Sequence, residues 1–270
     1  MTETLLSAAD VLNCRERPVW RSGKTDVEEN IMKVLAIGNS FSQDATRYLH
    51  GIAATMPVKM KVVNLYIGGC SLRTHYLNML EDRKNYMMEF NGVATGFMVS
   101  IKDALISDDW DVITLQQVSG NSVNYDTFQP YLNALAEYVR KYSPRSKLYI
   151  HQTWAYEEGS QRLCVEKGYA KEADMLADAV ASYDKAAEAI GADGIIPSGL
   201  VMYALHQRIP AVHRDTFHAS WGAGRFALAL NWYRCLTDGD ISDVKFNGFD
   251  VPVTEEEYKA AIDAVNEVLK

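Results

Sequence analysis

The chain has 270 residues, of which 48% are hydrophobic and 23% are charged, which is enough for one large globular domain with a sizeable core. Its 35 acidic residues outnumber the 27 lysines and arginines, and the net charge of -8 argues against nucleic acid or an anionic membrane surface as a partner. The sequence shows neither an apolar signal-peptide core nor a membrane-spanning run of about 18 apolar residues, so we expect a cytoplasmic protein.

The first elements of the domain are readable from the spacing of apolar residues. Residues 1–30 are polar and mixed in charge, and we expect them to form an extension before a single domain over residues 31–270. A short apolar strand is predicted over residues 34–37. A helix is predicted over residues 41–56, because its apolar side chains recur every three or four positions.

The same alternation continues along the rest of the chain. Further apolar strands are predicted over residues 62–65, 112–115, 148–150 and 194–196. Helical periodicity is found over residues 131–142, 170–190, 219–236 and 255–269. Short buried strands that alternate with amphipathic helices predict a three-layer α/β/α fold, with a flavodoxin-like parallel five-stranded sheet and helices on both faces.

Residues 72–110 interrupt this rhythm and are interpreted as an insertion over the edge of the sheet or its carboxyl ends. Within it, residues 85–92 are compatible with a strand followed by a turn, and residues 100–106 with a short helix.

A candidate nucleophile lies in the stretch KVLAIGNSFS, residues 33–42. The first strand stops at Gly38 and a helix follows, which places Ser40 at the carboxyl end of the strand. Open parallel sheets bind ligands at these ends, and the start of a helix offers backbone N–H groups to a developing negative charge. The alternative interpretation of Ser40 is a helix N-cap, a common role for serine.

A candidate partner for this serine comes just before the long helix predicted over residues 219–236. Asp215 and His218 are three residues apart, so one turn can carry an imidazole base and the carboxylate that orients it. The alternative is a capping aspartate beside a surface histidine. His213 lies nearby, but no metal-ligand spacing such as H-E-x-x-H is present, and no metal site is expected.

Together, these motifs resemble the SGNH, or GDSL-like, hydrolase superfamily, and within it the DUF4886-like group of bacterial domains with GNSFS in place of GDS. The resemblance runs from residue 33 to about residue 237. It implies an α/β/α esterase or acylhydrolase in which Ser40 is the nucleophile, His218 the general base and Asp215 its orienting partner. Such chemistry needs no metal or organic cofactor.

The resemblance also implies an oxyanion hole. The backbone N–H of Ser40 would contribute, together with the N–H of the glycine after the second strand, for which Gly69 is the better match and Gly68 its neighbour. Glycine lets the backbone approach a substrate carbonyl closely. Asn39 and Gly68 are expected to line the substrate site.

The third family block departs from the usual pattern. Where typical members place G-x-N-D after the third strand, this chain reads LQQVSGN over residues 115–121. A glutamine amide carries the same N–H donor, so we expect Gln117, or alternatively Gln116, to complete the oxyanion hole. Asn121 is a weaker candidate because it lies further along the loop.

Three further residues are interpreted from their positions. Trp154 and Tyr156 follow the fourth strand and are expected to border the same crevice, where they would either stack on a sugar or pack over the strand end. Asp44 is expected to be an acid of the first helical turn, favoured by the helix dipole.

We therefore expect a serine esterase that removes O-acetyl or other short acyl groups from a carbohydrate or similar polar substrate, a small molecule or a glycan ester. The alternatives are a lipase- or thioesterase-type acylhydrolase, and a catalytically silent carbohydrate-binding or regulatory module on the same fold. The sequence makes no prediction about the oligomeric state.

Overall fold

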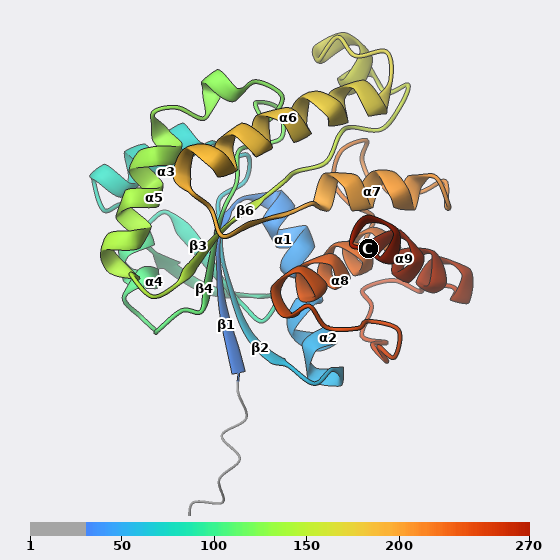
Figure 1. The fold of residues 1–270 in the computed structure, drawn as a ribbon, viewed down its shortest axis with the longest axis horizontal. Helices are drawn as coiled ribbons and strands as arrows, with labels where there is room; N and C mark the ends of the chain where they lie inside the picture. The colour runs from blue at the N-terminus through green and yellow to red at the C-terminus, as the bar shows by residue number, and fades with distance from the viewer. Residues whose placement is uncertain (1–30) are drawn as a thin grey trace, which may run out of the picture.

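The computed structural model describes residues 31–270, so the expected extension over residues 1–30 lies outside the described residues. The strands span Ile31–Gly38 (β1), Lys59–Tyr66 (β2), Tyr86–Phe90 (β3), Val93–Val99 (β4), Val112–Leu115 (β5), Lys147–His151 (β6) and Gly194–Ile196 (β7). They form one seven-stranded sheet in the order β4-β3-β2-β1-β5-β6-β7 (Figure 1).

The five strands predicted from the sequence are all present and parallel. They are β2, β1, β5, β6 and β7, in the spatial order of a flavodoxin-like sheet. The predicted number of strands is too small, because β3 and β4 add an antiparallel hairpin beside β2. The sheet therefore has seven strands instead of five.

Helices cover both faces of the sheet (Figure 1), as the predicted three-layer arrangement requires. They span Ser40–Thr46 (α1), Leu49–Thr55 (α2), Leu72–Leu80 (α3), Ile101–Leu105 (α4), Tyr131–Tyr142 (α5), Glu172–Ile190 (α6), Ser198–His206 (α7), Ala223–Thr237 (α8) and Glu255–Val268 (α9). One apolar core lies between the sheet and α1, α2, α7, α8 and α9. A second lies under α3, α4, α5 and the C-terminal half of α6. Residues 34–37 of β1 are apolar and buried, as expected for a strand that is covered on both faces.

The segment over residues 72–110 consists of α3, the β3–β4 hairpin and α4. The expected strand and short helix are β3 and α4, whereas β4 has no counterpart in the sequence-based prediction. Asn91 and Gly92 make the tight turn of the hairpin with φ values of 51° and 82°, in the left-handed region that a two-residue hairpin loop favours. The turn packs against the backbone of Arg47, where a side chain at position 92 would clash.

The parallel strands bring their carboxyl ends to one edge of the sheet. The loops after β1, β2, β5 and β6 and the turn before α8 all meet there, and they carry the candidate site residues. Within residues 31–270, none of the helices is both long and apolar enough to cross a membrane.

Candidate active site

The turn between β1 and α1 exposes the hydroxyl of Ser40. Gly38 is required because a Cβ there would lie 2.9 Å from the side chain of Gln116. Asn39 is the N-cap of α1, since its Oδ1 accepts a hydrogen bond from the N–H of Phe41 at 2.9 Å. The N-cap interpretation of Ser40 is therefore wrong, and its hydroxyl remains available for another partner.

Ser40, His218 and Asp215 form one hydrogen-bonded chain. The Nε2 atom of His218 lies 2.8 Å from the Oγ of Ser40, and its Nδ1 lies 2.8 Å from the Oδ2 of Asp215. The second carboxylate oxygen of Asp215 accepts the backbone N–H of His218 at 2.9 Å. Partial burial raises the pKa of Asp215, but the bonds from His218 outweigh it, and the net pKa lies below the usual value. The carboxylate can therefore fix the imidazole tautomer that leaves Nε2 to act as a base.

The turn that carries His218 is closed by its own backbone. His213 and Ala219 pair as an isolated antiparallel bridge. Between them, the N–H of Arg214 donates to the carbonyl of His218 at 3.0 Å. These two contacts fix the shape of the turn that carries the imidazole.

Trp154 packs against the turn that carries His218. Its indole Nε1 donates to the carbonyl of Phe217 at 2.7 Å, and its ring stacks on Phe41 with centroids 4.0 Å apart. The side chain is almost fully buried and does not line the pocket. The expectation that Trp154 stacks on a substrate is wrong; the alternative, packing at the strand end, is what the structure shows. Tyr156 does line the pocket, with its hydroxyl 3.1 Å from that of Ser119.

Asp44 joins α1 to the turn. Its buried carboxylate accepts bonds from Arg214 at 2.8 and 2.9 Å and from the Nε of Arg225 at 2.9 Å, and it also accepts the backbone N–H of Ala219 at 3.2 Å. Asp44 is thus a buried anchor and not the expected acid of the first helical turn. No local sequence signal indicates this, because the partners lie 170 and 181 residues away.

Two backbone N–H groups are candidates for an oxyanion hole. Ser40 is the first residue of α1, so its N–H has no intrahelical acceptor. Gly69 has a φ of +63°, and within residues 31–270 no acceptor is found for its N–H. Both residues line the same pocket, as do Ser119 and Gly120 after β5, whose N–H groups also have no acceptor among the described residues.

Gln117 does not present its amide to the pocket. Its Oε1 accepts the N–H groups of Leu72 and Val118 at 3.0 and 2.9 Å, and its Nε2 donates to the carbonyl of Thr127 at 2.9 Å. The side chain therefore joins three loops as a buried brace. This corrects the expectation that Gln117 completes the oxyanion hole.

Gln116 is engaged in the same way. Its Nε2 donates to the Oδ1 of Asn39 at 2.7 Å, and its Oε1 lies 2.7 Å from the Nδ1 of His151. Burial lowers the pKa of His151 to about 3, so the imidazole is neutral and can donate this hydrogen bond. The alternative oxyanion donor is thus also corrected, because Gln116 orients Asn39 from behind the nucleophile turn.

Ser40 lines a pocket of about 500 Å³, which is the size of an ordinary small-ligand site. The expected lining residues Asn39, Gly68, Gly69 and Tyr156 all contribute to it. The lining residues that the sequence interpretation missed are mostly polar, charged or aromatic: Phe41, Gln43, Tyr66, Val118, Ser119, Gly120, Arg162, Glu166, Lys167, Arg214 and Phe217. Phe217 could have been found from its place in the D-x-x-H turn, whereas the others carry no local motif.

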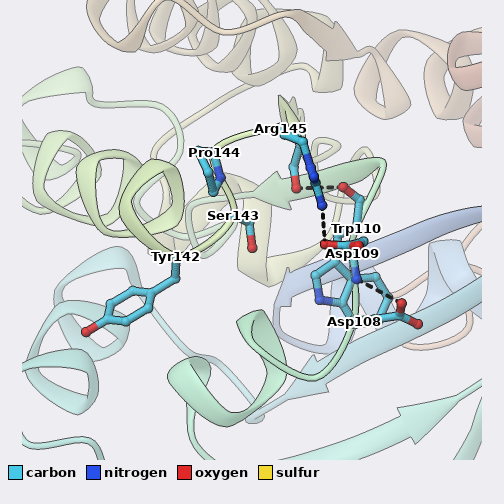
Figure 2. A pocket seen from close by; sticks show the side chains of 8 residues that line it. Asp108, Asp109, Trp110, Tyr142, Ser143, Pro144 and Arg145 are labelled. Atoms are coloured by element: carbon cyan, nitrogen blue, oxygen red, sulfur yellow. Dashed lines mark hydrogen bonds and ion pairs between the residues drawn. The ribbon is translucent and has the colours of Figure 1, made fainter.

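A smaller hollow of about 150 Å³ lies at the opposite end of the sheet (Figure 2). Figure 2 shows Arg145 there, paired with Asp109 at 2.6 Å. Its lining contains no histidine or cysteine. Among residues 31–270, no group of three or more His, Cys, Asp or Glu side chains is placed to hold a metal ion.

Comparison with solved structures identifies the fold. A candidate SGNH hydrolase from Slackia heliotrinireducens superposes with a TM-score of 0.55 at 23% identity, over 77% of this chain and 100% of that one. Axe2, an acetylxylan esterase from Geobacillus stearothermophilus, gives a TM-score of 0.52 at 16% identity, over 76% of this chain and 94% of that one. The chain therefore has the fold of the SGNH, or GDSL-like, hydrolases.

A nearer relationship comes from the family comparison. The family model described as "Domain of unknown function (DUF4886)" matches residues 33–265. A DUF4886 family protein from Bacteroides uniformis ATCC 8492 has 31% identity and a TM-score of 0.82, over 88% of this chain and 95% of that one. The chain belongs to the DUF4886 family. Comparison with curated proteins gave no match.

Proposed function

We propose that this protein is a serine esterase that removes short acyl groups, most simply acetyl, from a polar alcohol such as a sugar. The observation that carries the proposal is the chain of two 2.8 Å contacts from Ser40 through His218 to Asp215, at the mouth of a pocket. A hydroxyl needs a base within hydrogen-bond reach to attack an ester, and the base needs an oriented tautomer.

In the first half-reaction, the Oγ of Ser40 attacks the acyl carbonyl carbon while His218 Nε2 takes its proton. The oxyanion rests against the N–H groups of Ser40 and Gly69, and Asp215 stabilises the imidazolium. The bond to the alcohol oxygen then breaks, His218 returns the proton to that oxygen, and the acyl group remains on Ser40.

In the second half-reaction, water takes the place of the alcohol. His218 accepts one proton from the water as its oxygen attacks the acyl carbon, and the same two N–H groups receive the oxyanion. When the intermediate collapses, the proton passes to the Oγ of Ser40 and the free acid leaves. No other reactant is consumed.

The character of the pocket supports a polar alcohol over a long acyl chain. Gln43, Ser119, Arg162, Glu166 and Lys167 give the lining many hydrogen-bonding groups that a polar alcohol can use. Axe2, which shares the fold, is named as an acetylxylan esterase, and its substrate class agrees with this choice.

The test is hydrolysis of p-nitrophenyl acetate together with labelling by a fluorophosphonate. The wild-type protein should hydrolyse the ester and be labelled at Ser40, whereas Ser40→Ala should lose both activities, with turnover reduced about 10,000-fold or more. Ser107→Ala, at the far end of the sheet, is the matched control and should behave as wild type. Labelling of another serine, or equal activity in Ser40→Ala, would reject the assignment.

The second candidate function is a catalytically silent carbohydrate-binding module. It is favoured by one observation: neither Gln116 nor Gln117 presents an amide to the site, so the oxyanion hole depends on backbone groups alone. This function predicts that the wild-type protein and Ser40→Ala are equally inert and unlabelled, yet bind the same sugar with equal affinity.

A further inference from the structure

Arg162 forms a stacked layer beside the candidate base. Its guanidinium carbon lies 4.1 Å from the ring centroid of Phe217 and 5.7 Å from that of Tyr156. The Phe217 ring in turn lies 3.8 Å from the His218 imidazole, centroid to centroid. Two aromatic rings thus border the guanidinium at the pocket wall, and no hydrogen bond to a carboxylate occupies its N–H groups in the described residues.

This guanidinium has no carboxylate partner in the described part of the chain. Among residues 31–270, no ion pair involves Arg162 or the neighbouring Lys167, whose ammonium group donates to the carbonyl of Gly120 at 2.7 Å. Both side chains are half-buried and line the pocket of Ser40. In a chain with a net charge of -8, two half-buried cations without ion pairs in the same pocket point to an anionic ligand.

The balance of charge in the pocket indicates how much negative charge the ligand carries. The third lining cation, Arg214, already has an anionic partner in the buried carboxylate of Asp44, which it shares with Arg225. Glu166 is exposed, lines the same pocket and offsets one of the two remaining cations. At least one positive charge in the pocket is left uncompensated, which suits an anion. The planar fork of Arg162 matches a carboxylate, which it can bind through two parallel hydrogen bonds.

The position of Arg162 assigns this carboxylate to one side of the ester. His218 must return a proton to the leaving oxygen, so the alcohol lies on the side of its imidazole. Arg162 stacks on the ring next to that imidazole, whereas Gly68, Gly69 and Tyr66 border the pocket from the loop and strand end that carry the candidate oxyanion donor. The cation therefore faces the alcohol portion of the substrate.

From these contacts we propose that the pocket selects an acylated alcohol that carries a carboxylate, such as an O-acetylated uronic acid, and that Arg162 binds the carboxylate. This inference rests on the proposed esterase function. It adds the charge of the substrate and the residue that selects it.

The first experiment compares two matched sets of substrates, mono-O-acetylated methyl glucuronosides and the corresponding methyl glucosides. These sets differ only in a carboxylate against a hydroxymethyl group. The wild-type protein should show a kcat/KM roughly 10- to 100-fold higher for the best glucuronoside, the range expected for a charge-assisted pair of hydrogen bonds. The ratio should fall towards one in Arg162→Gln and decrease with added salt. Arg145→Gln, in the hollow at the far end of the sheet, should keep the wild-type ratio. Equal kcat/KM for both sets in the wild type would overturn the proposal.

The second experiment does not depend on turnover. Ser40→Ala is titrated with methyl glucuronoside and with methyl glucoside, and the two dissociation constants are compared. The carboxylate form should bind at least about tenfold more tightly, and adding Arg162→Gln should remove the difference while the melting temperature stays near that of Ser40→Ala. Equal binding, or no binding of either sugar, would reject the role of Arg162. If the charge preference is found but no acetylated sugar is hydrolysed and Ser40 is not labelled, the esterase function fails and the anionic binding site stands.

Discussion

Asp44 and Arg214 are joined by two hydrogen bonds of 2.8 and 2.9 Å, although 170 residues separate them in the sequence. Asp44 lies on α1, and Arg214 lies in the turn that carries His218. This contact fixes the segment of the candidate nucleophile relative to the segment of the candidate base. Arg225 joins the same carboxylate at 2.8 Å and continues to Asp250, also at 2.8 Å. The distance between Ser40 and His218 therefore depends on a buried ionic network.

Asp44→Asn should destabilise the protein and loosen the site together. The change leaves Arg214 and Arg225 without their buried countercharge, and removing one partner of a buried pair typically costs about 3–5 kcal/mol of unfolding free energy. Denaturant titration measures this loss, and ester hydrolysis below the transition should fall as well. Asp108→Asn, which removes the more exposed pairs with Lys33 and Lys61, should cost much less. Equal losses in the two variants would contradict the anchoring role of Asp44.

Gly69→Ala should reduce turnover more than stability. An alanine at a φ of +63° is strained by about 1–2 kcal/mol, and relief of this strain turns the N–H away from the developing oxyanion. We expect kcat to fall about 10- to 100-fold with a small change in KM. Gly191→Ala is matched to it, since Gly191 has a φ of +53° and open space at its Cβ, but it ends α6 away from the pocket. A similar loss of kcat in both variants would show that strain alone is responsible.

Gln117→Ala should show the opposite pattern. The side chain satisfies the buried N–H groups of Leu72 and Val118, and each buried group left unpaired costs about 1–3 kcal/mol. The free energy of unfolding should fall, whereas kcat measured well below the melting temperature should stay near that of the wild type. A loss of turnover of about 100-fold at unchanged stability would restore Gln117 as an oxyanion donor.

The protein should lose stability as the pH falls below about 6.5. Burial lowers the pKa of His75 and His151 to about 3 and that of His213 to about 4. The unfolded chain takes up these protons near the ordinary histidine pKa of about 6.5, while the folded protein does not. The unfolding free energy should therefore fall between pH 6.5 and 4, by up to about 1.4 kcal/mol per pH unit for each histidine.

Urea titrations at pH 7, 6 and 5 measure this dependence. His75→Phe keeps an aromatic ring beside Tyr86 but removes one titrating group, so its stability should fall less steeply with pH than that of the wild type. An unfolding free energy that is the same at pH 7 and pH 5 would show that these histidines take up protons in the fold.

The parallel strands and the helices that cover them were predictable, because a local pattern of apolar residues indicates each element. Residues 34–37 of β1 are a continuous apolar run that ends at Gly38, and the apolar residues of the helices recur every three or four positions. The β3–β4 hairpin was half missed for a physical reason: β4 lies at the sheet edge, and its exposed Val93 and Phe97 show no alternation between a buried and a solvated face.

The residues of the candidate site also fall into a predictable group and an unpredictable one. Ser40 and the pair Asp215 and His218 lie in short motifs, and their proximity follows from the common carboxyl edge of the strands. The role of Gln117 could not be read from residue type, because an amide can serve an oxyanion or brace a loop equally well. Arg162 was not found because it lies on the short π-helical segment Arg162–Glu166 between β6 and α6, and only the folded chain shows that it stacks on Phe217.

The long-range contacts around Asp44 also determine when the site appears during synthesis. Ser40 is made early, but its base comes 178 residues later, and Asp250, which pairs with Arg47, comes later still. A ribosome-bound chain that ends before the His213–Ala219 turn can pair β1 with β2 and β5, yet it lacks the base needed to attack an ester. Under the proposed esterase function, the site is complete only after the C-terminal quarter of the chain has folded back onto α1, so ester hydrolysis should report the completion of folding.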